Sequence, residues 1–120
     1  MGERSMAHIA IPSDDEFATT FGVASRSVDG EDAVRQIVLE SGRDVVTLVA
    51  DLPGASVRLV WRRDDVVLLD LFREAVEQVA IVDEDGATRL VATSALAGYR
   101  GELIIQIFPR VRVEDRQLIV

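Results

Sequence analysis

The chain of 120 residues contains no cysteine, no lysine and no asparagine, and it has a single histidine, His8. Without cysteine there is no disulfide framework, no thiolate zinc site, no iron–sulfur centre and no cysteine nucleophile. One histidine near the N-terminus disfavours a serine nucleophile with a histidine base. The phosphate-binding loop Gly-x-x-x-x-Gly-Lys-Ser/Thr needs lysine, and Gly-x-Gly-x-x-Gly does not occur. We therefore expect a protein that is not an enzyme and holds no metal ion or cofactor.

Long apolar runs are missing as well. No 18 consecutive residues are apolar, and no basic segment followed by an apolar one opens the chain. Neither a membrane span nor an export signal is indicated, so the expected location is the cytoplasm. Residues 1–6 (MGERSM) are interpreted as a leader or a cloning remnant, and residues 7–120 as a single domain.

Positive charge is scarce. Asp and Glu number 21 against 13 for Lys and Arg, which gives a net charge of −8. Because affinity for phosphates comes mostly from basic side chains, this balance disfavours a nucleic-acid partner. A basic or neutral protein is the more natural partner. All thirteen basic residues are arginine, which the codon composition of a GC-rich genome explains without any functional role.

Two helices are expected in the first third of the chain. Ser13 followed by three acidic residues is typical of a capping box, so a short helix should begin at Asp14 and end at Gly22. A second start signal at Asp29 precedes apolar residues at helical spacing over residues 33–38, and Gly42 follows as a terminator. The spacing predicts an amphipathic helix there.

Strands follow from residue 45 onward. Residues 45–50 and 57–61 flank a Leu-Pro-Gly turn and should pair as a hairpin, with the first strand covered on both faces. Residues 66–80 fit either a helix or a buried strand over 66–72 with a connection over 73–78, and the strand is preferred. Residues 79–82 and 87–92 flank Asp85-Gly86, a strong hairpin signal.

The last part of the chain completes the predicted sheet. Residues 103–108 form a buried strand that ends at Pro109, an alternating segment covers 110–113, Glu114-Asp115 is a turn, and residues 118–120 close the chain. The expected fold is α+β: one or two N-terminal helices packed on a mostly antiparallel sheet of five to seven strands.

Carboxylates are the only plentiful reactive groups. Asp70 lies between two leucines, and an ion pair with an arginine of the neighbouring strand is favoured over a role as general acid or base. Residues 83–86 form a hairpin turn more readily than a calcium loop, because the later ligands of such a loop are missing. Trp61 and Tyr99 are both candidate anchors of an interface, because large aromatic side chains are favoured there, but packing in the core is expected for Trp61.

These observations favour a small acidic module that binds another protein. The first hypothesis is an immunity protein or inhibitor that neutralises a toxin, with a basic nuclease-type toxin as the more specific candidate. The alternatives are a secretion chaperone or adaptor for a larger partner, and a small-ligand-binding or carboxylate-dependent enzyme domain. A monomer is favoured over a homodimer, with no nucleic acid and no membrane as partner. The expected partner-binding residues are the acidic turn residues Asp64, Asp65, Asp83, Glu84 and Asp85.

Overall fold

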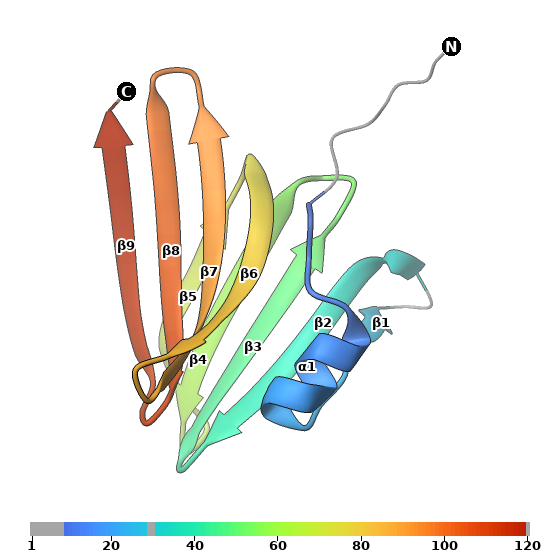
Figure 1. Ribbon diagram of the computed structural model, residues 1–120, viewed down its shortest axis with the longest axis vertical. Coiled ribbons are helices and arrows are strands. Elements are labelled where there is room, and N and C mark those ends of the chain that lie inside the picture. The colour runs from blue at the N-terminus through green and yellow to red at the C-terminus, as the bar shows by residue number, and fades with distance from the viewer. Residues whose placement is uncertain (1–8, 29–30, 120) are drawn as a thin grey trace.

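The computed structural model describes residues 9–28 and 31–119 (Figure 1). One short helix is followed by strands along the whole of the remaining described chain. The elements are α1 (Asp14–Phe21), β1 (Arg26–Val28), β2 (Glu31–Ser41), β3 (Asp44–Asp51), β4 (Ser56–Arg63), β5 (Val66–Arg73), β6 (Val76–Glu84), β7 (Ala87–Leu96), β8 (Tyr99–Phe108) and β9 (Arg112–Ile119).

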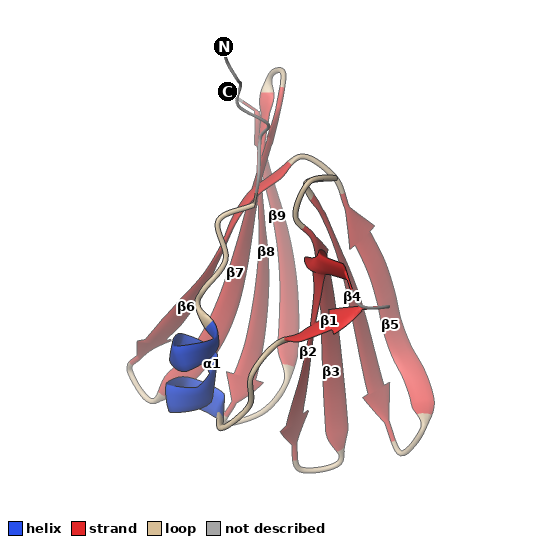
Figure 2. Ribbon diagram, turned by 90° about the vertical axis from the view of Figure 1, so that its right-hand side faces the viewer, coloured by secondary structure: helices blue, strands red, loops and turns tan. Residues whose placement is uncertain are grey.

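The strands form two antiparallel sheets that face each other (Figure 2). One sheet has the order β1-β2-β3-β4-β5 and the other the order β6-β7-β8-β9, so each strand pairs with its neighbours in the chain. The prediction of a mostly antiparallel sheet is confirmed. The expected five to seven strands are wrong, because nine described strands are split between two sheets. Two facing sheets bury each other's apolar faces, which one sheet with a single short helix cannot do.

The core lies between the two sheets. On β3 every second residue is buried, with Val46, Leu48 and Ala50 fully covered, while the residues between them are only half-buried. The expectation that this strand is covered on both faces is therefore wrong, since no described element packs on its outer side. Opposite β3, the second sheet contributes Leu90 and Ile105, which are also fully buried. Alternation along each strand gives one dry face and one wet face.

Residues 9–22 close one side of this sandwich. Ser13 and Glu16 make the predicted capping box, and Gly22 ends α1 in the left-handed conformation. Phe17 is fully buried in the core. Before the helix, the Ile9 amide donates to the Leu52 carbonyl next to the first sheet, while residue 10 bridges to β6 in the second sheet. Figures 1 and 2 show this segment beside β2 and β6.

The second predicted helix is wrong. Residues 31–41 form β2, which pairs with β3 over eight residue pairs, and the predicted start at Asp29 lies outside the described residues. Ile37 and Leu39, two positions apart, are both buried, whereas Val34 and Val38 are only half-buried. The segment satisfies both periods, and the long pairing with β3 decides in favour of the strand.

Two further expectations change in detail. The strand over residues 66–72 exists as β5, but it is mostly exposed and not buried, and the connection after it is only residues 74–75. Glu114 and Asp115 do not turn; they lie within the continuous strand β9. The hairpins at residues 45–61 and around Asp85-Gly86 are confirmed, and so is the end of a strand before Pro109.

The side chain of Asp44 in β3 bonds to two residues of β4, one of which is Trp61, the only tryptophan in the sequence. It is a buried acidic residue whose Oδ1 accepts hydrogen bonds from Trp61 Nε1 at 2.8 Å and Arg63 Nε at 2.9 Å. These donors, with Arg63 the stronger, hold the pKa of Asp44 below its ordinary value. Trp61 packs against the core but is only half-buried, so its predicted burial is correct in part.

We expect replacement of Asp44 by asparagine to lower stability by about 1–2 kcal/mol at pH 7, because hydrogen bonds to a charged group are lost. Since the folded pKa is depressed, the contribution of Asp44 is present above about pH 4 and is lost as the pH falls through its folded value. Urea unfolding from pH 7 to pH 2 measures this difference, which should shrink at low pH. The exposed turn variant Asp65→Asn is the control, and a constant difference for Asp44→Asn across this range would contradict the assignment.

Candidate functional site

The side of the sandwich opposite α1 is open. There β5 and β9 are the last strands of their sheets, and within the described chain each pairs on one side only (Figure 1). Arg73 at the end of β5 forms an ion pair with Asp115 in β9. No other ion pair between the two sheets is found among the described residues. This side therefore consists of two strand edges held by one charged contact.

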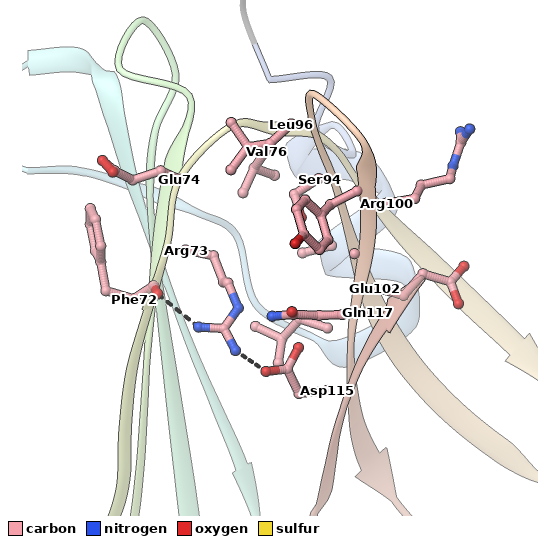
Figure 3. Close-up of a pocket in the computed structure, with 14 residues that line it drawn as sticks. Phe72, Arg73, Glu74, Val76, Ser94, Leu96, Arg100, Glu102, Asp115 and Gln117 are labelled. Carbon is pink, nitrogen blue, oxygen red and sulfur yellow. Dashed lines mark hydrogen bonds and ion pairs between the residues drawn. The ribbon is translucent and has the colours of Figure 1, made fainter. Parts of the chain in front are cut away.

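A groove of about 470 Å³ lies between these edges, where β5 and β7 end and β8 begins. It is lined by the end of β5, the start of β6, the end of β7, the start of β8 and the middle of β9 (Figure 3). Its residues are Phe72, Arg73, Glu74, Val76, Ala92, Ser94, Leu96, Tyr99, Arg100, Gly101, Glu102, Leu103, Asp115 and Gln117.

The groove exists because small residues occupy neighbouring positions in β7 and β8. Ser94 pairs with Gly101, and Ala92 lies two residues before Ser94 on the same face of β7. A Cβ atom on Gly101 would come within 2.6 Å of the Ser94 hydroxyl oxygen. Larger side chains at these positions would fill the groove, just as the core side chains fill the space between the sheets elsewhere in the sandwich.

The most deeply buried lining residues of the groove are the apolar Val76, Ala92 and Leu103, and the polar side chains that line it are only partly covered. The Arg73 guanidinium donates to the Phe72 carbonyl oxygen at 3.0 Å and to the Asp115 carboxylate. Tyr99 of β8 lines the same space, and Figure 3 shows Gln117 of β9 projecting toward it. A few hydrogen-bonding groups within an apolar surround are typical of binding sites.

Exposed apolar side chains continue from the groove along β5. The edge strand β9, in contrast, presents charged residues such as Arg112, Glu114 and Arg116. Charged edges resist pairing with other chains, whereas apolar edges favour it. At least 46% of each of these side chains is exposed: Val66, Val67, Leu68 and Phe72 on β5, and Leu96 and Tyr99 beside the groove.

The acidic residues predicted to bind a partner lie at the other end of the sandwich. Asp64 and Asp65 form the β4–β5 turn. Asp83 and Glu84 are the last residues of β6, and Asp85 begins the β6–β7 turn; both hairpins close at the lower end in Figure 1. Asp64, Asp65 and Asp85 have φ values of 50°, 66° and 55°, which aspartate tolerates in tight turns. The structure thus places the two acidic turns at one end but on different sheets.

Not all of these carboxylates are free to contact a partner. Asp64 forms an ion pair with Arg43 of the β2–β3 turn, and Asp83 accepts a hydrogen bond from the Thr88 hydroxyl at 3.1 Å. Asp65, Glu84 and Asp85 are exposed, and none of them forms an ion pair with another described residue. These three are the carboxylates best placed to attract a basic surface.

The other candidate residues do not form a catalytic or metal site within the described chain. Asp70 forms the predicted ion pair with an arginine of the neighbouring strand, Arg58, at 2.6 Å. Its pKa is lowered, chiefly by the hydrogen bond from Arg58, which does not suit a general acid. His8 lies outside the described residues. Between residues 9 and 119, excluding 29–30, no group of three metal-ligating side chains is found.

The groove was not predicted from the sequence, apart from Tyr99 as an alternative anchor. Ser94, Gly101 and Asp115 are assigned no role by their local pattern, and Arg73 was placed in a connection. The available signal was the concentration of small residues over positions 92–101, which is unusual between two buried strands.

In the described part of the chain, no helix has the length and apolar character needed to span a membrane.

Comparison with known proteins gives one result, and it concerns the fold. No family model and no curated protein matches the sequence. A solved structure titled "Contact-dependent growth inhibition toxin - immunity protein complex from Klebsiella pneumoniae 342" contains a chain similar in structure. The TM-score is 0.82, the sequence identity is 12%, and the match covers 94% of this chain and 100% of the other. At this identity the comparison shows that the two chains share a fold.

Proposed function

We propose that this protein is an immunity protein that binds and neutralises a toxin. The observation that carries the proposal is the shared fold, which extends over 94% of the chain and the whole of a chain from a toxin–immunity protein complex. A fold alone does not determine a function, so the argument also depends on this chain's own surface.

The surface favours the inhibitor over the toxin of such a pair. A toxin that acts as an enzyme needs a nucleophile, a general base or a metal site, and the described residues offer no group of metal-ligating side chains. Hydrogen bonds from arginines lower the pKa values of Asp44 and Asp70, and a hydrogen bond from the Ser25 hydroxyl, followed by the charge of Arg35, lowers that of Asp14. What remains is an acidic protein with an apolar open side, which suits binding and not catalysis.

The net charge of −8 supports a basic partner, as a toxin that acts on nucleic acid would be. Opposite charges accelerate the encounter of two proteins. We propose that Asp65, Glu84 and Asp85 supply most of this attraction, with Asp64 and Asp83 contributing less because they are already bonded. A cytoplasmic monomer fits this role, since a free inhibitor must meet the toxin before the toxin reaches its target.

A secretion chaperone or adaptor is the second candidate, and the exposed apolar strand β5 is the observation that favours it. Such a protein would keep its partner soluble without abolishing the activity of the folded partner. Protection of cells from an active toxin therefore separates the two candidates.

Co-expression tests the proposal directly. The product of the gene next to the one for this protein serves as the candidate toxin; it is expressed from an inducible promoter, with and without the protein, and colony survival is counted. We expect full survival only when the protein is present, because an immunity protein occupies the toxin and stops its activity. The fold-disrupting variant Leu48→Asp serves as the control. Equal killing in the presence and absence of the intact protein would contradict the proposal.

The acidic turns generate a second prediction. Replacing Asp83, Glu84 and Asp85 together by serine, with Gly86 kept for the turn, should leave the melting temperature nearly unchanged because exposed charges contribute little. The association rate with the toxin should fall about tenfold at low salt and less at high salt. Stopped-flow mixing at several salt concentrations measures both effects. An unchanged rate at low salt would remove this turn from the binding account.

A further inference from the structure

The groove and the free edge of β5 form one continuous surface, and we propose that an extended segment of the toxin docks on it. The segment lies along β5, inserts a large apolar side chain into the groove, and places a basic residue near Glu74. This inference rests on the proposed function and names the part of the toxin that is captured.

The length of the apolar surface indicates a polypeptide segment and not a small molecule. β5 has eight residues, which at about 3.3 Å per residue give an edge of roughly 26 Å. Val66 and Val67 are exposed at one end of it, and Phe72 and the groove lie at the other. Backbone N–H and C=O groups along a free edge pair naturally with an extended chain.

The two open edges are not equivalent. β9 carries charged residues over most of its length, the ordinary protection of an edge strand, and exposes the apolar side chains Leu118 and Ile119 at its end. β5 presents apolar side chains from one end to the other and a single carboxylate, Asp70, that is already paired with Arg58. A soluble protein that leaves one edge apolar and the neighbouring edge charged favours pairing on the first. The segment should therefore follow β5.

The groove at the end of β5 suits one large side chain with a polar end. Its volume of about 470 Å³ exceeds that of a tyrosine or phenylalanine side chain, and Leu96 and Val76 supply apolar walls. Gln117 and the Arg73–Asp115 pair line it as well and offer hydrogen-bonding groups. Aromatic residues in such pockets supply much of the binding energy of protein complexes.

Charge decides between the toxin and a second copy as the occupant. Glu74 lies at the groove and Asp65 at the opposite end of β5, and neither makes an ion pair with a described residue. A second copy would bring a further net charge of −8 and the same carboxylates to this edge. A basic, partly apolar segment complements both ends of the strand.

Two matched pairs of variants test the inference with the toxin that the co-expression experiment identifies, in a catalytically inactive form. Ser94→Leu fills the groove, and Thr93→Leu places the same side chain on the opposite face of β7. Glu74→Arg reverses a charge at the groove, and Glu77→Arg makes the same change on β6. Titration calorimetry gives the affinities, and thermal unfolding reports whether each variant is folded.

We expect Ser94→Leu to weaken binding by about 30-fold or more, because it occupies the place of the anchoring side chain, while its melting temperature stays the same or rises. Glu74→Arg should weaken binding about fivefold at low salt. Both controls should bind within about twofold of the original protein.

Several outcomes would overturn the inference, each in a recognisable way. If the toxin binds the original protein and Ser94→Leu equally well, the groove is not the docking site although the proposed function stands. If the toxin does not bind the original protein, the proposed function fails and the inference with it. If light scattering shows a dimer that Ser94→Leu dissociates, the occupant of the groove is a second copy.

Discussion

The exposed edges of a two-sheet sandwich are the constraint on which the rest of this structure depends. Two open antiparallel sheets leave four edge strands, and each edge carries unpaired backbone groups that attract other chains. Residues 9–22 cover one side, where the chain bridges from Leu52 to β6 and Phe17 enters the core. On the other side, charged residues protect most of β9, apart from the exposed Leu118 and Ile119 at its end, whereas β5 remains apolar and uncovered along its length. Of the four edges, β5 therefore offers the largest apolar surface to a partner.

Local signals in the sequence were reliable where backbone chemistry alone decides the outcome. The capping box at Ser13, the Asp85-Gly86 turn and the strand end at Pro109 follow from the residues that form them. β2 was mistaken for a helix because its apolar residues satisfy both periods, and only pairing with a distant strand distinguishes them. The division into two sheets was likewise out of reach, since it depends on the short connection at residues 74–75 and not on the composition of any strand.

The candidate site shows the same limit more strongly. Charged turns are visible in a sequence: residues 64–65 and Asp85 lie in turns as expected, and Asp83 and Glu84 are the last residues of β6 before the second of these turns. The groove is not visible, because it arises where Ser94 and Gly101 from paired strands face Arg73 from the opposite sheet. In the proposed complex the two features have different roles. The exposed carboxylates at one end raise the association rate, and the apolar edge and groove supply most of the binding energy.

Hydrogen–deuterium exchange on the complex with the inactive toxin domain tests the central claim, that the partner covers the open side of the sandwich. The amides along the free edge of β5 lack a described strand partner, so they should exchange rapidly in the free protein. The account predicts that toxin binding protects β5 and residues 94–103 most strongly, with little change in β1 and β2 on the closed side. Protection confined to the closed side, or to the turns at residues 64–65 and 83–86, would contradict it.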